Sequence, residues 1–290
     1  MAQAPSEKWV IVNGLDFHYR DWGGSGQPIV LLHGLASSCH IWDMVAPILA
    51  KDYAVIALDQ RGHGESAKPT EGYDFASVTQ DVLGVIDYLE GPPPIVVGHS
   101  WGGSVALGLA VRAPESLQGM AWVDGGMINA SARYDSVEDA KLEMSPPDFT
   151  GVKLEDFKER VRNRHQGGGM APGSHEVVMA NFEVLADQTI KAWLTRANHL
   201  RIIEALWDHR PVQLYKQVQC PVLIMPARQQ ADPSTQDRGQ RRMFSVGEAE
   251  EMLPNSKTVW LENSVHDVPI QRPELVAEVL KSHINDGFFG

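Results

Sequence analysis

Cysteine and long apolar runs are scarce in this 290-residue sequence. Its two cysteines, Cys39 and Cys220, lie far apart and in no spacing typical of metal ligands. Cys220 begins an apolar strand pattern, so we expect it to be a buried free thiol. No window approaches the roughly eighteen apolar residues of a membrane span, and the first residues lack the apolar stretch of a signal peptide. We therefore expect a cytoplasmic protein with no membrane partner.

Positively charged residues are also fewer than negatively charged ones, and the formal net charge is −12. This balance argues against nucleic acid or an anionic membrane as a partner. The chain has no His-Glu-x-x-His, P-loop or Gly-x-Gly-x-x-Gly motif, so the sequence indicates no metal and no nucleotide cofactor. What remains is an ordinary globular composition with 43% hydrophobic residues.

Short apolar runs predict the strands. Residues 9–12 and 15–19 flank Asn13-Gly14, which is typical of a β-hairpin with a type I′ turn. Further apolar runs of strand length cover residues 28–32, 54–58, 95–97, 119–123, 221–225 and 258–261. Helical patterns separate most of them, one on residues 78–89 and another from Pro273 onwards. Continuous apolar runs alternating with helices favour an α/β fold whose mostly parallel sheet is flanked by helices on both faces.

The alternation of strand and helix patterns stops between residues 127 and 215. This range has no strand pattern, and its helical stretches are interrupted by Pro146-Pro147. We interpret residues 127–215 as a helical cap, or lid, inserted into a core made of residues 1–126 and 216–290.

A nucleophile-elbow pattern follows the apolar run at 95–97. Gly98-x-Ser100-x-Gly102 lies where a strand gives way to a helix of small residues. A sharp strand-to-helix turn strains the central residue and leaves no room for side chains two positions away, which explains the glycines. The turn lifts the Ser100 hydroxyl clear of the sheet, at a helix N-terminus whose backbone N–H groups are free. Ser100 is therefore the candidate nucleophile.

Taken together, four segments identify the chain as similar to the cap-bearing α/β-hydrolases, a group that includes carboxylesterases, lactonases, haloperoxidase-like enzymes and haloalkane dehalogenases. The segments occur in the family's order and are residues 33–38 (HGLASS), 59–66 (DQRGHGES), 98–103 (GHSWGG) and 266–269 (HDVP). The resemblance covers the core and weakens across the cap. It implies a structural role for residues 59–66, where we expect Arg61 to pair with buried carboxyl or carbonyl groups.

His266 is the candidate general base, because it follows the last strand in the chain order nucleophile, acid, histidine. An imidazole can accept the Ser100 proton near neutral pH and return it to the leaving group. The family usually has glycine before this histidine, whereas here Val265 precedes it. His99 adjoins Ser100, and we expect its side chain to point away across the turn.

Two residues compete for the carboxylate that orients the base. Most of the family places it after the strand that here is 222–225, where Gln230 occupies the expected position and Asp232 lies two residues late. Some members place it after the strand that follows the elbow helix, and Asp124 stands there without offset. We favour Asp124, with Asp232 as the alternative acid.

The oxyanion hole is expected at the backbone N–H groups of Leu35 and Trp101, which follow His33-Gly34 and the nucleophile. Two preorganised donors there would stabilise the charge that develops on a carbonyl oxygen. The side chains of Leu35 and Trp101, together with Trp42, are the candidates for the substrate pocket.

These motifs and the resemblance predict a serine hydrolase that cleaves a carboxylic ester through an acyl-enzyme intermediate, so the expected partner is a small-molecule ester or lactone substrate. A lactonase, a carbon–carbon bond hydrolase and a cofactor-free perhydrolase are alternatives on the same residues. A ligand receptor built on a hydrolase fold, with vestigial turnover, is an alternative of another class. Serine at position 100 argues against dehalogenase and epoxide hydrolase chemistry, because those relatives use a carboxylate there.

Overall fold

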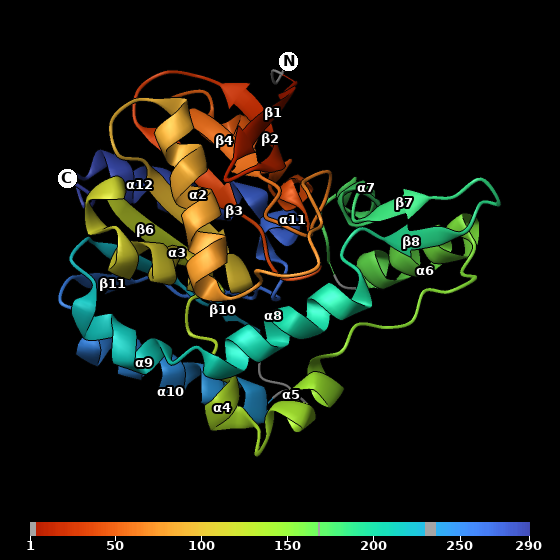
Figure 1. Ribbon diagram of the computed structural model, residues 1–290. Helices are drawn as coiled ribbons and strands as arrows, with labels where there is room; N and C mark the ends of the chain where they lie inside the picture. The colour runs from red at the N-terminus through yellow and green to blue at the C-terminus, as the bar shows by residue number, and fades with distance from the viewer. Residues whose placement is uncertain (1–3, 168, 230–235) are drawn as a thin grey trace.

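The computed structural model describes residues 4–167, 169–229 and 236–290 (Figure 1). Its centre is an eight-stranded sheet in the order β1-β2-β4-β3-β5-β6-β9-β11. Strand β2 pairs in antiparallel fashion with β1 and with β4, and every other pair in this sheet is parallel. The strands are β1 (Ser6–Val12), β2 (Leu15–Gly23), β3 (Pro28–Leu32), β4 (Ala54–Leu58), β5 (Ile95–His99), β6 (Gly119–Val123), β9 (Val222–Met225) and β11 (Ser256–Thr258).

The expected hairpin joins β1 to β2. Asn13 and Gly14 both have positive φ, at 53° and 76°, as a type I′ turn requires. In the central strands alternate side chains enter two separate hydrophobic clusters. Val30 and Val96 lie in one cluster, whereas Leu31 and Val97 lie in the other. The sheet is thus buried on both faces, and the predicted α/β fold is confirmed.

Helices cover the two faces of the sheet (Figure 1). On one face lie α2 (Phe75–Leu89) and α3 (Trp101–Arg112), which pack against each other. Asp74 caps α2 by accepting a hydrogen bond from the Ser77 N–H over 2.9 Å. The opposite face carries α1 (Ala46–Leu49), α11 (Val268–Gln271) and α12 (Pro273–Asn285), and α10 (Gln236–Met252) packs beside β11. Short 3₁₀ turns are η1 (Cys39–Trp42), η2 (Pro114–Ser116) and η3 (Tyr215–Gln217).

The segment between β6 and β9 is mostly helical, but the expectation that it contains no strands was wrong. Two three-residue strands, β7 (Phe182–Val184) and β8 (Ile190–Ala192), form an antiparallel hairpin beside α6 and α7 (Figure 1). Its turn is fixed by Asp187, whose Oδ1 accepts from the backbone and the hydroxyl of Thr189. Three-residue strands are too short to show an alternating pattern. The helices of this segment are α4 (Ala130–Arg133), α5 (Val137–Met144), α6 (Leu154–Gly167), α7 (Ser174–Met179), α8 (Arg196–Asp208) and α9 (Pro211–Leu214).

The last predicted strand, residues 258–261, is divided in the structure. Strand β11 ends at Thr258, and β12 (Leu261–Glu262) pairs with β10 (Ala227–Arg228) in a separate parallel pair. The break lies opposite Pro226, which has no N–H to continue the ladder. Across the described ranges, none of the helices combines the length and the apolar character needed to cross a membrane.

Candidate active site

Ser100 lies in a strained turn between β5 and α3. Its φ and ψ are 52° and −119°, far from any relaxed region for a residue with a side chain. The turn is held because the Ser100 N–H donates to the Val123 carbonyl over 3.2 Å. The glycines on either side are sterically required, since a Cβ on Gly98 would lie 2.3 Å from the backbone of Gly102. The expected elbow is therefore present, with Ser100 half-buried at its tip.

His266 and Asp124 both lie next to Ser100. The His266 Nε2 atom is 3.0 Å from Ser100 Oγ, and its Nδ1 atom is 2.6 Å from Asp124 Oδ2. Ser100 follows β5, Asp124 follows the neighbouring strand β6, and His266 lies between β12 and α11. The structure thus brings together three of the sequence-predicted residues. Asp232, the alternative acid, lies outside the described residues.

Asp124 is almost fully buried, with 2% of its side chain exposed. Its Oδ1 atom accepts from the Ala227 N–H over 2.9 Å, and its Oδ2 atom accepts from Arg242 Nη2 over 2.8 Å as well as from His266. Burial opposes ionisation, but the hydrogen bond with His266, its charge and that of Arg242 hold the pKa of Asp124 below its ordinary value. The carboxylate is therefore charged at neutral pH.

The His266 side chain is about half exposed, at 49%. Desolvation lowers the pKa of His266, but the hydrogen bond to Asp124 and its negative charge outweigh that effect and raise the pKa above the ordinary value. With Asp124 accepting the Nδ1 proton, the lone pair of the neutral ring lies on Nε2 and faces Ser100. The ring can therefore accept a proton from the hydroxyl.

The two residues expected to supply oxyanion donors, Leu35 and Trp101, belong to segments next to Ser100. Trp101 is the first residue of α3, and Leu35 follows Gly34, where an added Cβ would lie 3.0 Å from Ser100 Cβ. Within the described ranges, neither the Leu35 nor the Trp101 N–H donates to a backbone carbonyl in a turn or cap. The two N–H groups stay the predicted donors of an oxyanion hole.

A cleft of about 770 Å³ opens at Ser100 and His266. Its walls come from the start of the inserted segment, including α4, and from α10, and most of the lining surface is apolar. The lining residues include Met127, Ile128, Tyr134, Met144, Arg242 and Phe244. The three side chains predicted for the substrate pocket do not line this cleft.

For two of those side chains the pocket prediction was wrong. Trp42 and Trp101 are 0% and 1% exposed and belong to the hydrophobic clusters on the two sides of the sheet. The Trp101 ring stacks on His63 with centroids 5.4 Å apart, so it points into the protein interior and leaves only its backbone N–H at the site. Leu35 is half-buried and packs against the same cluster as Trp101.

Sequence reasoning missed two contacts of the site. The His99 Nε2–H donates to the backbone carbonyl of His266 over 2.9 Å, so the residue beside the nucleophile supports the loop of the base. Burial, and then the charge of His266, lowers the pKa of His99 to about 4. Arg242, which holds Asp124, lies in α10 outside every motif. Its sequence context carries no signal for this contact.

The loop at residues 59–66 has the structural contacts expected of it. Arg61 forms an ion pair with the buried carboxylate of Asp81, with Nη2 to Oδ1 at 2.7 Å, and it also donates to the Gly72 carbonyl over 2.6 Å. The expected pairing of Arg61 with carboxyl and carbonyl groups is confirmed.

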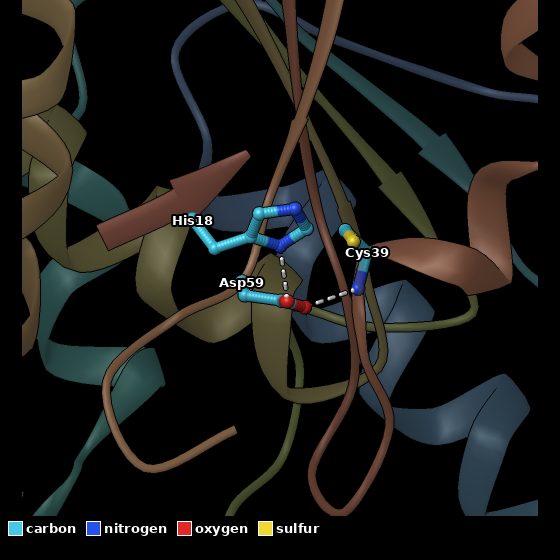
Figure 2. Close-up of side chains that lie close together, drawn as sticks. All are labelled: His18, Cys39 and Asp59. Carbon is cyan, nitrogen blue, oxygen red and sulfur yellow. Dashed lines mark hydrogen bonds and ion pairs between the residues drawn. The ribbon is translucent and has the colours of Figure 1, made fainter. Parts of the chain in front are cut away.

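One buried cluster beside this loop has the composition of a metal site. Figure 2 shows His18 and the Cys39 backbone nitrogen both directed at Asp59. His18 Nδ1 is 2.8 Å from Asp59 Oδ2, and the Cys39 N–H donates to Asp59 Oδ1 over 2.7 Å. The other ring nitrogen of His18 faces Glu7 at 2.8 Å. Because protein donors already occupy both carboxylate oxygens and both ring nitrogens are engaged, the cluster fits a buried hydrogen-bond network.

Ionisation within this cluster is consistent with such a network. Burial opposes charge on both partners, but their mutual hydrogen bond raises the pKa of His18 and lowers the pKa of Asp59. Burial and the nearby Asp59 charge raise the pKa of the Cys39 thiol, which disfavours the thiolate that a metal needs. A second group consists of His99, His266 and Asp267, and it includes the His266 imidazole that contacts Ser100.

Comparison with known proteins identifies the family. The sequence model of the Alpha/beta hydrolase family matches residues 29–279, so the chain belongs to this family. It is 44% identical over 126 residues to a soluble epoxide hydrolase of Corynebacterium sp. (strain C12), a match that covers 43% of this chain and 44% of that protein. The chain thus spans less than half the length of that relative.

Other similarities extend over nearly the whole chain. The uncharacterized hydrolase YugF of Bacillus subtilis (strain 168) is 26% identical over 286 residues, which is 95% of each protein. The crystal structure of E-2-(acetamidomethylene)succinate hydrolase superposes with a TM-score of 0.77 at 18% identity and covers 97% of this chain and 99% of that one. These likenesses support the α/β-hydrolase fold.

Proposed function

We propose that this protein is a serine hydrolase that cleaves carboxylic esters through an acyl-enzyme intermediate. The observation that carries the proposal is the continuous contact from Ser100 Oγ to His266 Nε2, at 3.0 Å, and from His266 Nδ1 to Asp124 Oδ2, at 2.6 Å. A serine hydroxyl is a weak nucleophile until an adjacent base removes its proton. The contacts supply that base together with the carboxylate that orients it.

In the first half of the reaction, Ser100 Oγ attacks the ester carbonyl while His266 takes its proton. Asp124 stabilises the imidazolium that forms, and the Leu35 and Trp101 N–H groups stabilise the oxyanion, each donor contributing about 3 kcal/mol to the transition state. His266 then returns the proton to the departing alcohol. In the second half, His266 deprotonates a water molecule that cleaves the acyl-enzyme and regenerates Ser100.

The cleft suggests the kind of substrate. A volume of about 770 Å³ with a mainly apolar lining suits a small-molecule ester of modest size. We propose that residues 127–215 act as a cap over the core formed by residues 1–126 and 216–290. Met127 and Met144 of that segment line the cleft that contains Ser100, so the segment would shape the substrate site.

The nucleophile separates this proposal from epoxide hydrolysis, the reaction named for the relative that is 44% identical. Position 100 carries a hydroxyl, not the carboxylate expected for that chemistry. An acylated serine, which water can hydrolyse, is the intermediate that a hydroxyl and an oxyanion hole favour.

Steady-state hydrolysis of a short-chain p-nitrophenyl ester tests the proposal. We expect turnover that one equivalent of an organophosphorus reagent abolishes, and we expect Ser100→Ala to lower kcat by at least about 10³-fold. Ser104→Ala is a matched control, because Ser104 lies one turn further along α3 with a buried hydroxyl that has no hydrogen-bond partner among the described residues. Its activity should be unchanged. A single burst without turnover, or full activity in Ser100→Ala, would contradict the proposal.

A further inference from the structure

Arg242 of α10 reaches the buried carboxylate of Asp124. Its Nη2 donates to Asp124 Oδ2 over 2.8 Å, and its Nη1 donates to the Ala227 carbonyl over 2.9 Å. The Arg242 side chain is 22% exposed, whereas that of Asp124 is 2% exposed. Two hydrogen bonds from one guanidinium fix its position, so the charge stays beside the carboxylate.

This contact matters because Asp124 Oδ2 accepts both from Arg242, which is always charged, and from His266, which is charged only when protonated. When His266 is neutral, the buried carboxylate has no counter-charge from the ring, and an unpaired buried charge is costly. Arg242 supplies that counter-charge in the resting state. When His266 becomes protonated, it shares the same oxygen, at 2.6 Å, with the guanidinium.

We propose that Arg242 is a positioning residue, which neutralises Asp124 while His266 is unprotonated and so keeps His266 available as the base. The proposal rests on the serine hydrolase function proposed above and adds to it a residue outside the family motifs. Arg242 acts through Asp124 and does not touch the reacting atoms.

Charged or titratable groups from several elements face His266. Asp124 follows β6, Arg242 lies on α10, Asp267 is the next residue in the chain, and His99 ends β5. Desolvation lowers the pKa of His266, Asp124 and then Asp267 raise it, and the charge of Arg242 lowers it. Removal of Arg242 leaves Asp124 to pair with His266 alone, so the imidazolium becomes more favourable.

The pH dependence of kcat/KM for a p-nitrophenyl ester tests this role. For Arg242→Gln we expect the acidic limb to move up by about one pH unit, so kcat/KM falls approximately tenfold at pH values below the limb. At high pH, kcat/KM should reach a plateau within about threefold of the unmodified protein. Arg242→Met is a second charge-removing variant, and Arg242→Lys should keep most of the original profile. Arg241→Gln is the control for the loss of one positive charge at the cleft, because Arg241 lines the same cleft next to Arg242. Its substitution can change kcat/KM through the substrate, so only the pH of its acidic limb is compared, and that pH should stay unchanged.

A second measurement does not need activity. The His266 imidazole can be titrated by NMR in Ser100→Ala with and without Arg242→Gln, and we expect the same upward shift. If esters are not cleaved, the proposed function fails, but this titration still decides the role of Arg242. The role of Arg242 is overturned if neither the acidic limb nor the His266 titration moves in Arg242→Gln and Arg242→Met. It is also overturned if Arg241→Gln shifts them equally. Either result leaves the hydrolase function intact.

Discussion

Replacing Asp124 with asparagine tests the choice between the two candidate acids. The side chain keeps its shape but loses its charge. On the Oδ2 side two donors, Arg242 and His266, require an acceptor, whereas on the Oδ1 side only the Ala227 N–H does. We therefore expect the amide oxygen to take the Oδ2 position, so the His266 tautomer survives and the main loss is electrostatic.

The size of that loss follows from the geometry. Unit charges centred about 4 Å apart, as in a hydrogen-bonded imidazolium and carboxylate, attract by about 4 kcal/mol at an effective dielectric constant of about 20. Loss of this stabilisation lowers kcat by about 10³-fold. In Asp124→Asn the charge of Arg242 also stands uncompensated beside the imidazolium, which raises the expected loss towards 10⁴-fold. Adding Arg242→Gln to Asp124→Asn should then raise kcat by about tenfold.

The assay is steady-state hydrolysis of a short-chain p-nitrophenyl ester, with far-UV circular dichroism and a melting curve to verify folding. Asp232→Asn is the comparison variant and should stay within about threefold of the unmodified protein. If Asp124→Asn keeps more than a tenth of the activity while Asp232→Asn loses several orders of magnitude, the acid lies after β9 and the reasoning is refuted.

Two further variants test the surroundings of the site. Gly34→Ala places a Cβ 3.0 Å from Ser100 Cβ, so we expect kcat to fall about tenfold to 100-fold with little change in melting temperature, and an unchanged kcat would show that Ser100 can move without cost. His18→Gln should lower the free energy of unfolding by about 2–4 kcal/mol, because Asp59 loses a buried charged partner. The raised pKa of His18 adds stability that is lost as pH rises above about 6.5, and the lowered pKa of Asp59 adds stability that is lost as pH falls below about 4. Urea titrations should therefore show the largest difference between His18→Gln and the unmodified protein near pH 5–6, and a difference that grows towards pH 8 would contradict this assignment.

Strand positions were predictable because each depends on a local apolar run. The runs at residues 28–32, 54–58 and 119–123 have the same limits as β3, β4 and β6. The errors have two causes, a strand that is too short and a strand that is divided by a residue far away in the sequence. The strands of the β7–β8 hairpin are too short for a pattern, and the run at 258–261 is divided at the level of Pro226, which lies between β9 and β10.

Side-chain direction was predicted less well than position. Trp42 and Trp101 flank loops that carry motif residues, and proximity in sequence suggested a pocket. Helical geometry instead turns the Trp101 ring into the core beside His63. The Arg242 contact was invisible for a similar reason, because its partner Asp124 is 118 residues away along the chain. Such contacts depend on how α10 packs, which no short pattern encodes.

The placement of Asp124 follows from the register of three parallel strands. His99 pairs with Val123 and Val123 pairs with Met225, so Ser100 and Asp124 are the first residues beyond two adjacent strand ends. The Ser100 N–H donates to the Val123 carbonyl, and the Asp124 N–H donates to the Met225 carbonyl over 3.0 Å. Both residues have positive φ, at 52° and 46°, as the chain leaves the sheet. A slip of one residue would point the Asp124 carboxylate to the other face of the sheet, away from His266. The lengths of the apolar runs thus help to place Asp124 next to Ser100, although this becomes apparent only when the strands are aligned.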